Sequence, residues 1–166
     1  MFTNRTRQLI AATLQGLPLH LTIESFQAPD VELDMEEHKG GRFIAEEMAK
    51  GGKVLNAKLI LQGIGAPVLM ALGSVRDINL NVRESGKDQD DNPWWTYHTV
   101  QGKFKSLKET TLEMGKKPVT ELEISCRTYT RLENGILVAD IDARTQKFML
   151  NGEDILADAR RLVLLP

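Results

Sequence analysis

The sequence predicts a mainly β protein, a sandwich or partial barrel that carries one or two short helices. The first observation is alternation: Leu122, Ile124 and Cys126 are separated by polar residues. An apolar period of two is typical of a half-buried strand. The second observation is that turn signals containing glycine and asparagine fall between such runs. Together they indicate antiparallel strands, each with one solvated face.

The same alternation recurs earlier in the chain, where apolar residues occupy every second position of four more runs. Each of these runs is expected to form one strand. The runs are Leu19, Leu21 and Ile23; Val31, Leu33 and Met35; Leu55, Ala57, Leu59 and Leu61; and Ile78, Leu80 and Val82.

Three short segments predict tight turns between strands. Residues 15–18 read Gln-Gly-Leu-Pro, residues 133–135 read Glu-Asn-Gly, and residues 151–152 read Asn-Gly. Asn-Gly supplies the positive φ angles that a type I′ hairpin turn requires. The alternation changes phase once, close to Ser106, and this predicts a β-bulge of the kind that helps a sheet to curl.

Helical signals are few. Residues 67–72 begin with a proline and are followed by a glycine, which predicts a short helix. Residues 153–162 carry an apolar stripe at helical spacing and predict a second one. Residues 42–50, between two glycine pairs, could also be helical. No repeat or linker divides the chain, so residues 1–166 are expected to form one domain, with residues 1–12 as a candidate N-terminal arm.

Composition excludes several classes of protein. The chain has 166 residues, 42% of them hydrophobic and 27% charged, as in ordinary globular proteins. A net charge of −2 provides no basic footprint for nucleic acid. One cysteine, Cys126, allows neither an internal disulfide nor a cysteine metal cluster. No run approaches the roughly 20 apolar residues of a membrane span. The expected compartment is a reducing cytoplasm.

No set of residues predicts catalysis, a cofactor site or a metal site, and the chain is not expected to be an enzyme. Glu36 and His38 would share a strand face, but a zinc site needs a third protein ligand there. Residues 88–92, which read Asp-Gln-Asp-Asp-Asn, are not followed by the glycine and glutamate of a calcium loop. Cys126 lies on an apolar strand face and is expected to be an inert core thiol.

Three segments follow one another in the order and spacing of a known family. Their marker residues are Pro29, Leu33, Met35, Gly40 and Gly41; then Gly102, Lys103, Lys105, Gly115 and Pro118; then Tyr129, Asn134, Gly135, Asp142, Gly152, Asp154 and Arg160. This ordered set resembles the major tail tube protein family of contractile-tailed phages and R-type pyocins. The resemblance covers most of the chain from about residue 13. Arg42-Phe43 and the ending at residues 164–166 depart from the family pattern.

The resemblance implies a structural subunit of a virion tail. It implies hexameric rings, stacked into a hollow tube, in which strands of neighbouring subunits join into one continuous β-barrel. It further implies a sheath protein outside, and a tape measure protein and then DNA inside, bound without sequence specificity. Baseplate and tail terminator proteins would cap the ends, no membrane would be involved, and assembly would take place in the host bacterial cytoplasm.

The acids Glu32, Asp34 and Glu36 are the candidate lumen-lining residues, because an acidic lumen would repel DNA phosphates. An ordinary solvated outer face explains the same alternation. The segment around residues 40–52 is the candidate inter-subunit contact, because its apolar side chains stand in a polar stretch; a surface loop with a local anchor is the alternative. The candidate contact residues are Gly40, Gly41, Phe43, Ile44 and Met48.

Two other functions stay open at this stage. One is the tube of a pyocin or a type VI-like injection machine, which carries no genome. The other is a monomeric β-barrel that binds a lipid or carbohydrate, supported only by the aromatic pair Trp94 and Trp95 and by polar strand faces. Since neighbouring residues on a strand point to opposite faces, at least one of these two tryptophans is expected to be core or interface.

Overall fold

The computed structural model describes residues 3–63 and 77–165 of the chain, so the helix predicted at residues 67–72 lies outside the described residues. The described part is built almost wholly from antiparallel strands with one short helix, α2. The mainly β prediction is therefore confirmed. In chain order the elements are β1 (Arg5–Leu14), β2 (Leu17–Pro18), β3 (Ile23–Gln27), β4 (Leu33–His38), β5 (Glu46–Gly52), β6 (Leu55–Gln62), β7 (Ile78–Asp88), β8 (Pro93–Glu109), β9 (Val119–Glu133), β10 (Ile136–Asp142), β11 (Lys147–Leu150), β12 (Glu153–Asp154) and α2 (Ala157–Leu162).

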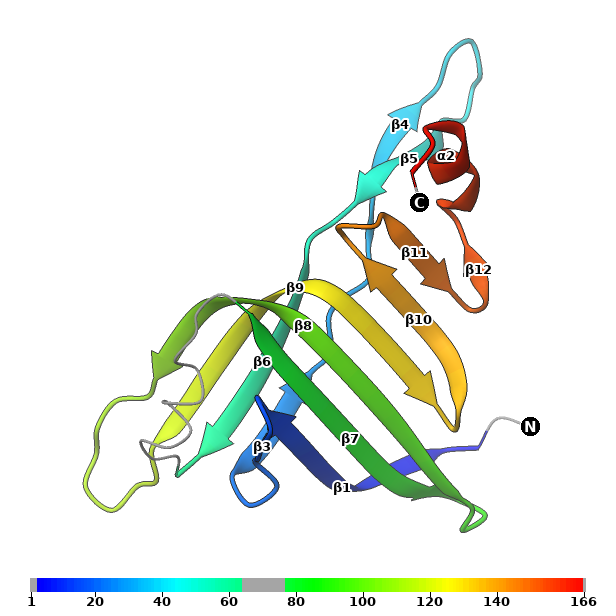
Figure 1. The fold of residues 1–166 in the computed structure, drawn as a ribbon. Coiled ribbons are helices and arrows are strands. Elements are labelled where there is room, and N and C mark those ends of the chain that lie inside the picture. The colour runs from blue at the N-terminus through cyan, green and yellow to red at the C-terminus, as the bar shows by residue number, and fades with distance from the viewer. Residues whose placement is uncertain (1–2, 64–76, 166) are drawn as a thin grey trace.

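Ten of these strands form one continuous sheet that folds back over itself (Figure 1). Its main path runs in the order β12-β11-β10-β9-β8-β7-β1-β2. Strand β6 branches from this path by pairing with β9, and β3 pairs with β6. Strands β4 and β5 form a separate two-stranded sheet, which projects from the body as a hairpin (Figure 1).

The two longest strands, β8 and β9, belong to both parts of the folded sheet. The second half of β8 pairs with the first half of β9, from Gly102 opposite Cys126 to Glu109 opposite Thr120. That same half of β9 pairs on its other side with β6. We call the unit made of β3, β6 and these two half-strands the four-stranded subsheet. The other halves of β8 and β9 join it to the rest of the sheet.

The register shifts twice between β8 and β9, once between Gln101 and Gly102 and once between Phe104 and Ser106. The second shift confirms the bulge predicted near Ser106. The first requires glycine, because a Cβ at Gly102 would lie 2.0 Å from the carbonyl oxygen of Ser125. A bulge increases the local twist and bends a strand, so these positions are where the sheet turns over.

The core lies between the four-stranded subsheet and the part of the sheet built by β1 and β7. Strand β6 alternates as predicted, with Leu55, Ala57, Leu59 and Leu61 buried and their neighbours half-exposed. Leu122, Ile124 and Cys126 of β9 face the same core, and so do Leu80 and Val82 of β7. At about 25 cal/mol per Å² of buried apolar surface, this cluster is the main source of stability.

The predicted turns are confirmed. Gln15 and Gly16 join β1 to β2. Asn134 and Gly135 have φ angles of 49° and 83° and join β9 to β10. Asn151 and Gly152 have φ angles of 52° and 85°. Positive φ at both central residues is the signature of a type I′ turn.

Three sequence predictions are corrected. Residues 42–50 are not helical: residues 46–52 form β5, because β4 needs backbone hydrogen-bond partners and β5 supplies them. The helix expected over residues 153–162 begins only at Ala157, since Glu153 and Asp154 pair with β11 across the preceding turn. The run Leu19, Leu21 and Ile23 does not form one strand: hydrogen bonds from the Thr22 and Ile23 N–H groups to the Leu19 carbonyl close a turn, and β3 begins only at Ile23. Residues 5–12 belong to β1, which pairs with β7 along its length.

We predict that Gly102→Ala lowers the free energy of unfolding by about 2 kcal/mol or more, because the added methyl group overlaps a backbone carbonyl that cannot move away cheaply. Urea denaturation of the monomeric chain measures this. Gly41→Ala is the matched control, since Gly41 is exposed and no atom lies within 4 Å of its Cβ position. Equal midpoints for the two variants would contradict the prediction.

Candidate functional site

The four-stranded subsheet has two open edges. One edge is β3 and the other is the second half of β8, residues 103–109; within residues 3–63 and 77–165 no strand pairs with the outer side of either. Every pairing in the subsheet is antiparallel. With four alternating strands, the two outer strands run in opposite directions. Copies repeated side by side can therefore pair edge to edge and keep the alternation.

The face of the subsheet that points away from the core is polar and carries charges of both signs. Lys58 of β6 lies 3.6 Å from Glu121 of β9, and Lys105 of β8 lies 3.5 Å from Glu123. Lys105 also donates a hydrogen bond of 3.2 Å to Asn56. Cross-strand pairs of opposite charge stabilise a solvated sheet face. This face is wet and ion-paired rather than uniformly acidic.

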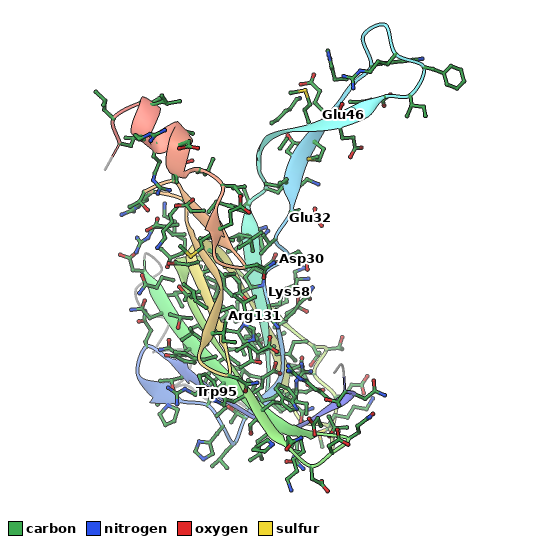
Figure 2. The ribbon with its side chains drawn as sticks, turned by 90° about the vertical axis from the view of Figure 1, so that its right-hand side faces the viewer. Asp30, Glu32, Glu46, Lys58, Trp95 and Arg131 are labelled. Atoms are coloured by element: carbon green, nitrogen blue, oxygen red, sulfur yellow. The ribbon has the colours of Figure 1, made fainter. Side chains whose placement is uncertain are left out.

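The hairpin of β4 and β5 carries both groups of residues that the sequence singled out. Asp34 and Glu36 lie on β4, and Glu32 lies just before it, where it binds Lys53 at 3.0 Å. All three acids are exposed. In Figure 2 Asp30 and Glu32 lie above Lys58, so the hairpin continues the direction of β3 and β6 beyond the body.

The candidate contact residues lie nearer the tip of the same hairpin. Phe43 is 96% exposed, Ile44 76% and Met48 58%. In the described part of the chain the two strands pair only with each other, and an isolated two-stranded hairpin is marginally stable in water. Apolar side chains displayed on such an element are expected to bind another surface.

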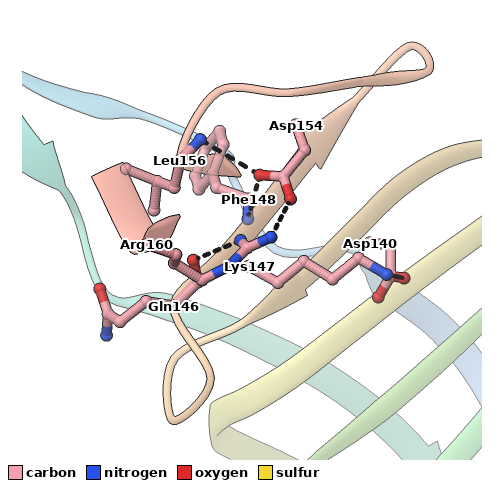
Figure 3. Close-up of polar contacts among 7 residues, drawn as sticks. All are labelled: Asp140, Gln146, Lys147, Phe148, Asp154, Leu156 and Arg160. Atoms are coloured by element: carbon pink, nitrogen blue, oxygen red, sulfur yellow. Dashed lines mark hydrogen bonds and ion pairs between the residues drawn. The ribbon is translucent and has the colours of Figure 1, made fainter. Parts of the chain in front are cut away.

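A polar cluster fixes the C-terminal segment against β11 (Figure 3). The Asp154 carboxylate accepts hydrogen bonds from the Leu156 backbone N–H at 3.1 Å and from Arg160 at 2.7 Å. Arg160 also donates to the Gln146 carbonyl at 2.9 Å. The hydrogen bond from Arg160 lowers the pKa of Asp154. No residue of α2 is buried, so this cluster anchors the helix.

Beyond this anchor the chain displays apolar side chains. Leu162, Val163 and Leu164 are 78%, 66% and 90% exposed. The expected apolar stripe is therefore present, but it faces solvent instead of the core. The segment and the hairpin lie at the same end of the molecule (Figure 1).

A cleft of about 350 Å³ opens where the core face of the sheet is left uncovered near the N-terminal part of β1. We call it the arginine cleft. Three arginines stand there with two glutamates: Arg5 and Arg131 bind Glu133, and Arg7 binds Glu84. Its lining residues are Arg5, Arg7, Glu84, Trp94, Thr96, Arg131 and Glu133.

His98 lies beside this cleft in the core, where it contacts the Tyr129 hydroxyl through Nδ1 at 2.9 Å. Burial lowers the pKa of His98 to about 4, and the charges of Arg131 and Arg7 add to the effect. Burial likewise raises the pKa of Cys126 to about 12. That thiol is therefore protonated and unreactive at neutral pH.

The described residues offer little for ligand or metal chemistry. Within residues 3–63 and 77–165 no three histidine, cysteine or acidic side chains are grouped to hold a metal ion. In the same part of the chain no helix is long and apolar enough to cross a membrane. Trp94 is 7% exposed and Trp95 43% exposed, on opposite faces of β8, so they form no shared ligand platform.

A model of the family described as phage tail tube protein FII matches residues 8–163. The chain belongs to the phage tail tube protein FII family. It is therefore a structural subunit of a tail tube. Comparison with curated proteins finds no match.

Solved structures with the same fold come from contractile systems. A chain of the sheath–tube complex of PVC, an extracellular contractile injection system, in its extended state is 11% identical, with a TM-score of 0.55 over 75% of this chain and 88% of that chain. A chain of the anti-feeding prophage baseplate is 15% identical, with a TM-score of 0.55 over 80% and 97%. A chain of the PVC sheath/tube terminator is 12% identical, with a TM-score of 0.55 over 75% and 93%. At these identities the likeness is one of fold.

Sequence reasoning missed the arginine cleft. Arg5 and Arg7 fell in the segment assigned to an arm, and Glu84, Trp94 and Arg131 belong to three other strands. The pairings of β1 with β7, of β7 with β8 and of β8 with β9 together bring these groups to one place. The sequence did contain two signals of a charged strand face: arginines at positions 5 and 7, and charged residues at positions 131 and 133.

We predict that the wild-type chain loses about 2 kcal/mol of unfolding free energy between pH 7 and pH 5 because of His98, whose pKa is lower in the folded than in the unfolded chain. Stability from this group is complete above the unfolded pKa near 6.5 and is lost as the pH falls toward 4. Denaturant titrations at several pH values measure it. His98→Gln should show a much flatter profile; an unchanged slope would refute the assignment.

Proposed function

We propose that the chain forms hexameric rings in which the four-stranded subsheets of neighbouring copies join edge to edge, and that these rings stack into a tube that conducts the genome. The observation that supports this most is the pair of open, oppositely directed edges, β3 and residues 103–109 of β8. A head-to-tail ring pairs each β3 with the β8 edge of the next copy. Ring closure then removes exposed strand edges, which otherwise invite uncontrolled association.

The polar face of the subsheet would line the lumen in such a barrel, because its other face is packed on the core. Lys58, Glu121, Lys105 and Glu123 would then stand in the wall as neutral ion pairs. Such a wall offers DNA phosphates neither a continuous cationic surface nor unpaired base-reading groups. DNA would pass without sequence-specific binding.

The lumen-lining role of Glu32, Asp34 and Glu36 stays a prediction. These acids would extend the wall beyond the barrel, since the hairpin continues the direction of β3 and β6 (Figure 2). Their negative charge would repel phosphates at each junction between rings.

A tail tube needs protein partners on its outside, in its lumen and at its two ends. We propose a sheath protein on the outer surface, a tape measure protein and then DNA inside, and baseplate and tail terminator proteins at the ends. The exposed residues Leu162, Val163 and Leu164 are the proposed contact with the sheath. The subunits would be made and assembled in the cytoplasm of the host bacterium.

We predict that assembly protects the backbone amides of residues 23–27 and 103–109 from hydrogen exchange, because edge pairing supplies their missing backbone partners. Exchange is compared between dilute monomer and assembled material, and electron microscopy counts the subunits in each ring. Residues 122–126, which are already paired on both sides, serve as the internal control. New protection elsewhere, with none at the two edges, would contradict the edge pairing.

We predict that Glu32→Lys combined with Asp34→Lys leaves tube assembly intact and slows genome ejection, because cations in the lumen would bind phosphates. Single-particle ejection rates measure this effect. Asp90→Lys with Glu113→Lys, on two exposed loops, makes the same change in net charge and serves as the control. Ejection at the wild-type rate would place Glu32 and Asp34 outside the lumen.

A further inference from the structure

We propose that the arginine cleft of one copy binds the acidic hairpin of a second copy, so that rings stack through a charged contact between opposite ends of the subunit. This inference rests on the proposed tube and names the groups that hold one ring to the next. It joins two surfaces of the chain that are each left incomplete in the monomer.

The hairpin has an internal charge conflict. In the register of β4 with β5, Glu37 lies directly opposite Glu47. Like charges directly opposite each other destabilise a strand pair. The neighbouring Glu46 is bound by Arg42, but within the described residues no cation binds Glu37 or Glu47. A cationic partner from a second copy would relieve the repulsion between these two exposed carboxylates.

The arginine cleft has a complementary excess of positive charge. Three guanidinium groups face two carboxylates there. Their side chains are accessible: Arg5 is 44% exposed, Arg7 59% and Arg131 38%. Guanidinium groups bind carboxylates through two parallel hydrogen bonds, which makes arginine well suited to an interface of this kind.

Unused donors in the cleft support the same conclusion. The indole Nε1 of Trp94 and the Nε of Arg131 are buried, and neither has an acceptor in the part of the chain that the structure describes. Trp94 itself is 7% exposed and lines the cleft. Buried donors are normally paired, and carboxylates arriving from a second copy would bring acceptors to the rim of this donor-rich site.

The two surfaces lie at opposite ends of the molecule. Figure 1 shows the hairpin projecting at one end, whereas the start of β1 and the turn between β7 and β8 lie at the other. A contact between different surfaces of identical copies is heterologous, and one that joins opposite ends grows into an open filament. It is also separate from the lateral edges of β3 and β8, so stacking and ring closure use different residues.

The test uses Glu47→Lys in the full chain. In the monomer this change replaces a like-charge pair with an opposite-charge pair and should stabilise the hairpin. In assembly it removes a carboxylate from the contact, so the concentration needed for stacking should rise at least ~10-fold. Sedimentation and electron microscopy would find rings and short stacks in place of long tubes. Wild-type tube length would overturn the proposal.

A charge swap identifies the cleft as the partner surface. Adding Arg7→Glu to Glu47→Lys should restore much of the tube length, whereas Arg7→Glu alone should shorten tubes. If Arg7→Glu fails to fold because Glu84 loses its partner, Arg7→Gln should keep the fold and still weaken stacking. Folded variants that neither weaken nor rescue stacking would overturn the cleft as the docking surface.

The control is Asp158→Lys, an exposed acid on α2, which should leave tube length unchanged. Raising the salt concentration should shorten wild-type tubes more than it affects isolated rings, because exposed charge contacts are screened. Wild-type tubes that form, with edge protection at residues 23–27 and 103–109, but ignore every charge change would reject this inference and leave the proposed tube standing. A wild-type chain that forms neither rings nor tubes would reject both.

Discussion

The bend that β8 and β9 make at Gly102 shapes the rest of the structure. Because both strands continue through it, one sheet supplies two layers, and the core between them needs no second sheet. A side chain at Gly102 would overlap the Ser125 carbonyl, so the backbones can approach closely only at glycine. Among the residues that the structure describes, the bend also leaves the second half of β8 without a strand partner on its outer side. Lateral assembly would depend on this edge.

The monomer keeps several surfaces that cost stability in isolation. Within residues 3–63 and 77–165 it has two open strand edges, a hairpin whose strands pair with no third strand, and a cleft with more guanidinium groups than carboxylates. Soluble monomers usually protect such features with charges, short edges or covering loops. Here they are placed so that neighbouring copies can cover them: the edges at the sides, the hairpin and cleft at the ends. The contacts that would close a ring therefore use different surfaces from the contacts that would stack one ring on the next.

The charges are also distributed differently on the lateral and the end surfaces. On the four-stranded subsheet the charges are locally balanced, as Lys58 with Glu121 and Lys105 with Glu123. Unbalanced charge is found at Glu37 and Glu47 on the hairpin and at the arginine cleft. Buried polar groups of the core are neutral at pH 7, as His98 shows. The hairpin and the cleft are therefore two places where a neighbouring copy can supply the opposite charge.

Local patterns determined much of the fold. Alternation predicted the buried faces of β6 and β9, Asn-Gly pairs predicted two turns, and the phase break predicted the bulge near Ser106, because side-chain direction and φ preferences depend on residues close in sequence. Tertiary structure alone decided that residues 46–52 pair with β4, that the helix begins at Ala157, and that Arg5, Glu84 and Arg131 meet in one cleft. The first two outcomes depend on which neighbouring segment a strand takes as its hydrogen-bond partner, and strand propensity is sensitive to such context. The cleft depends on pairing over long sequence separations, which leaves no local signal.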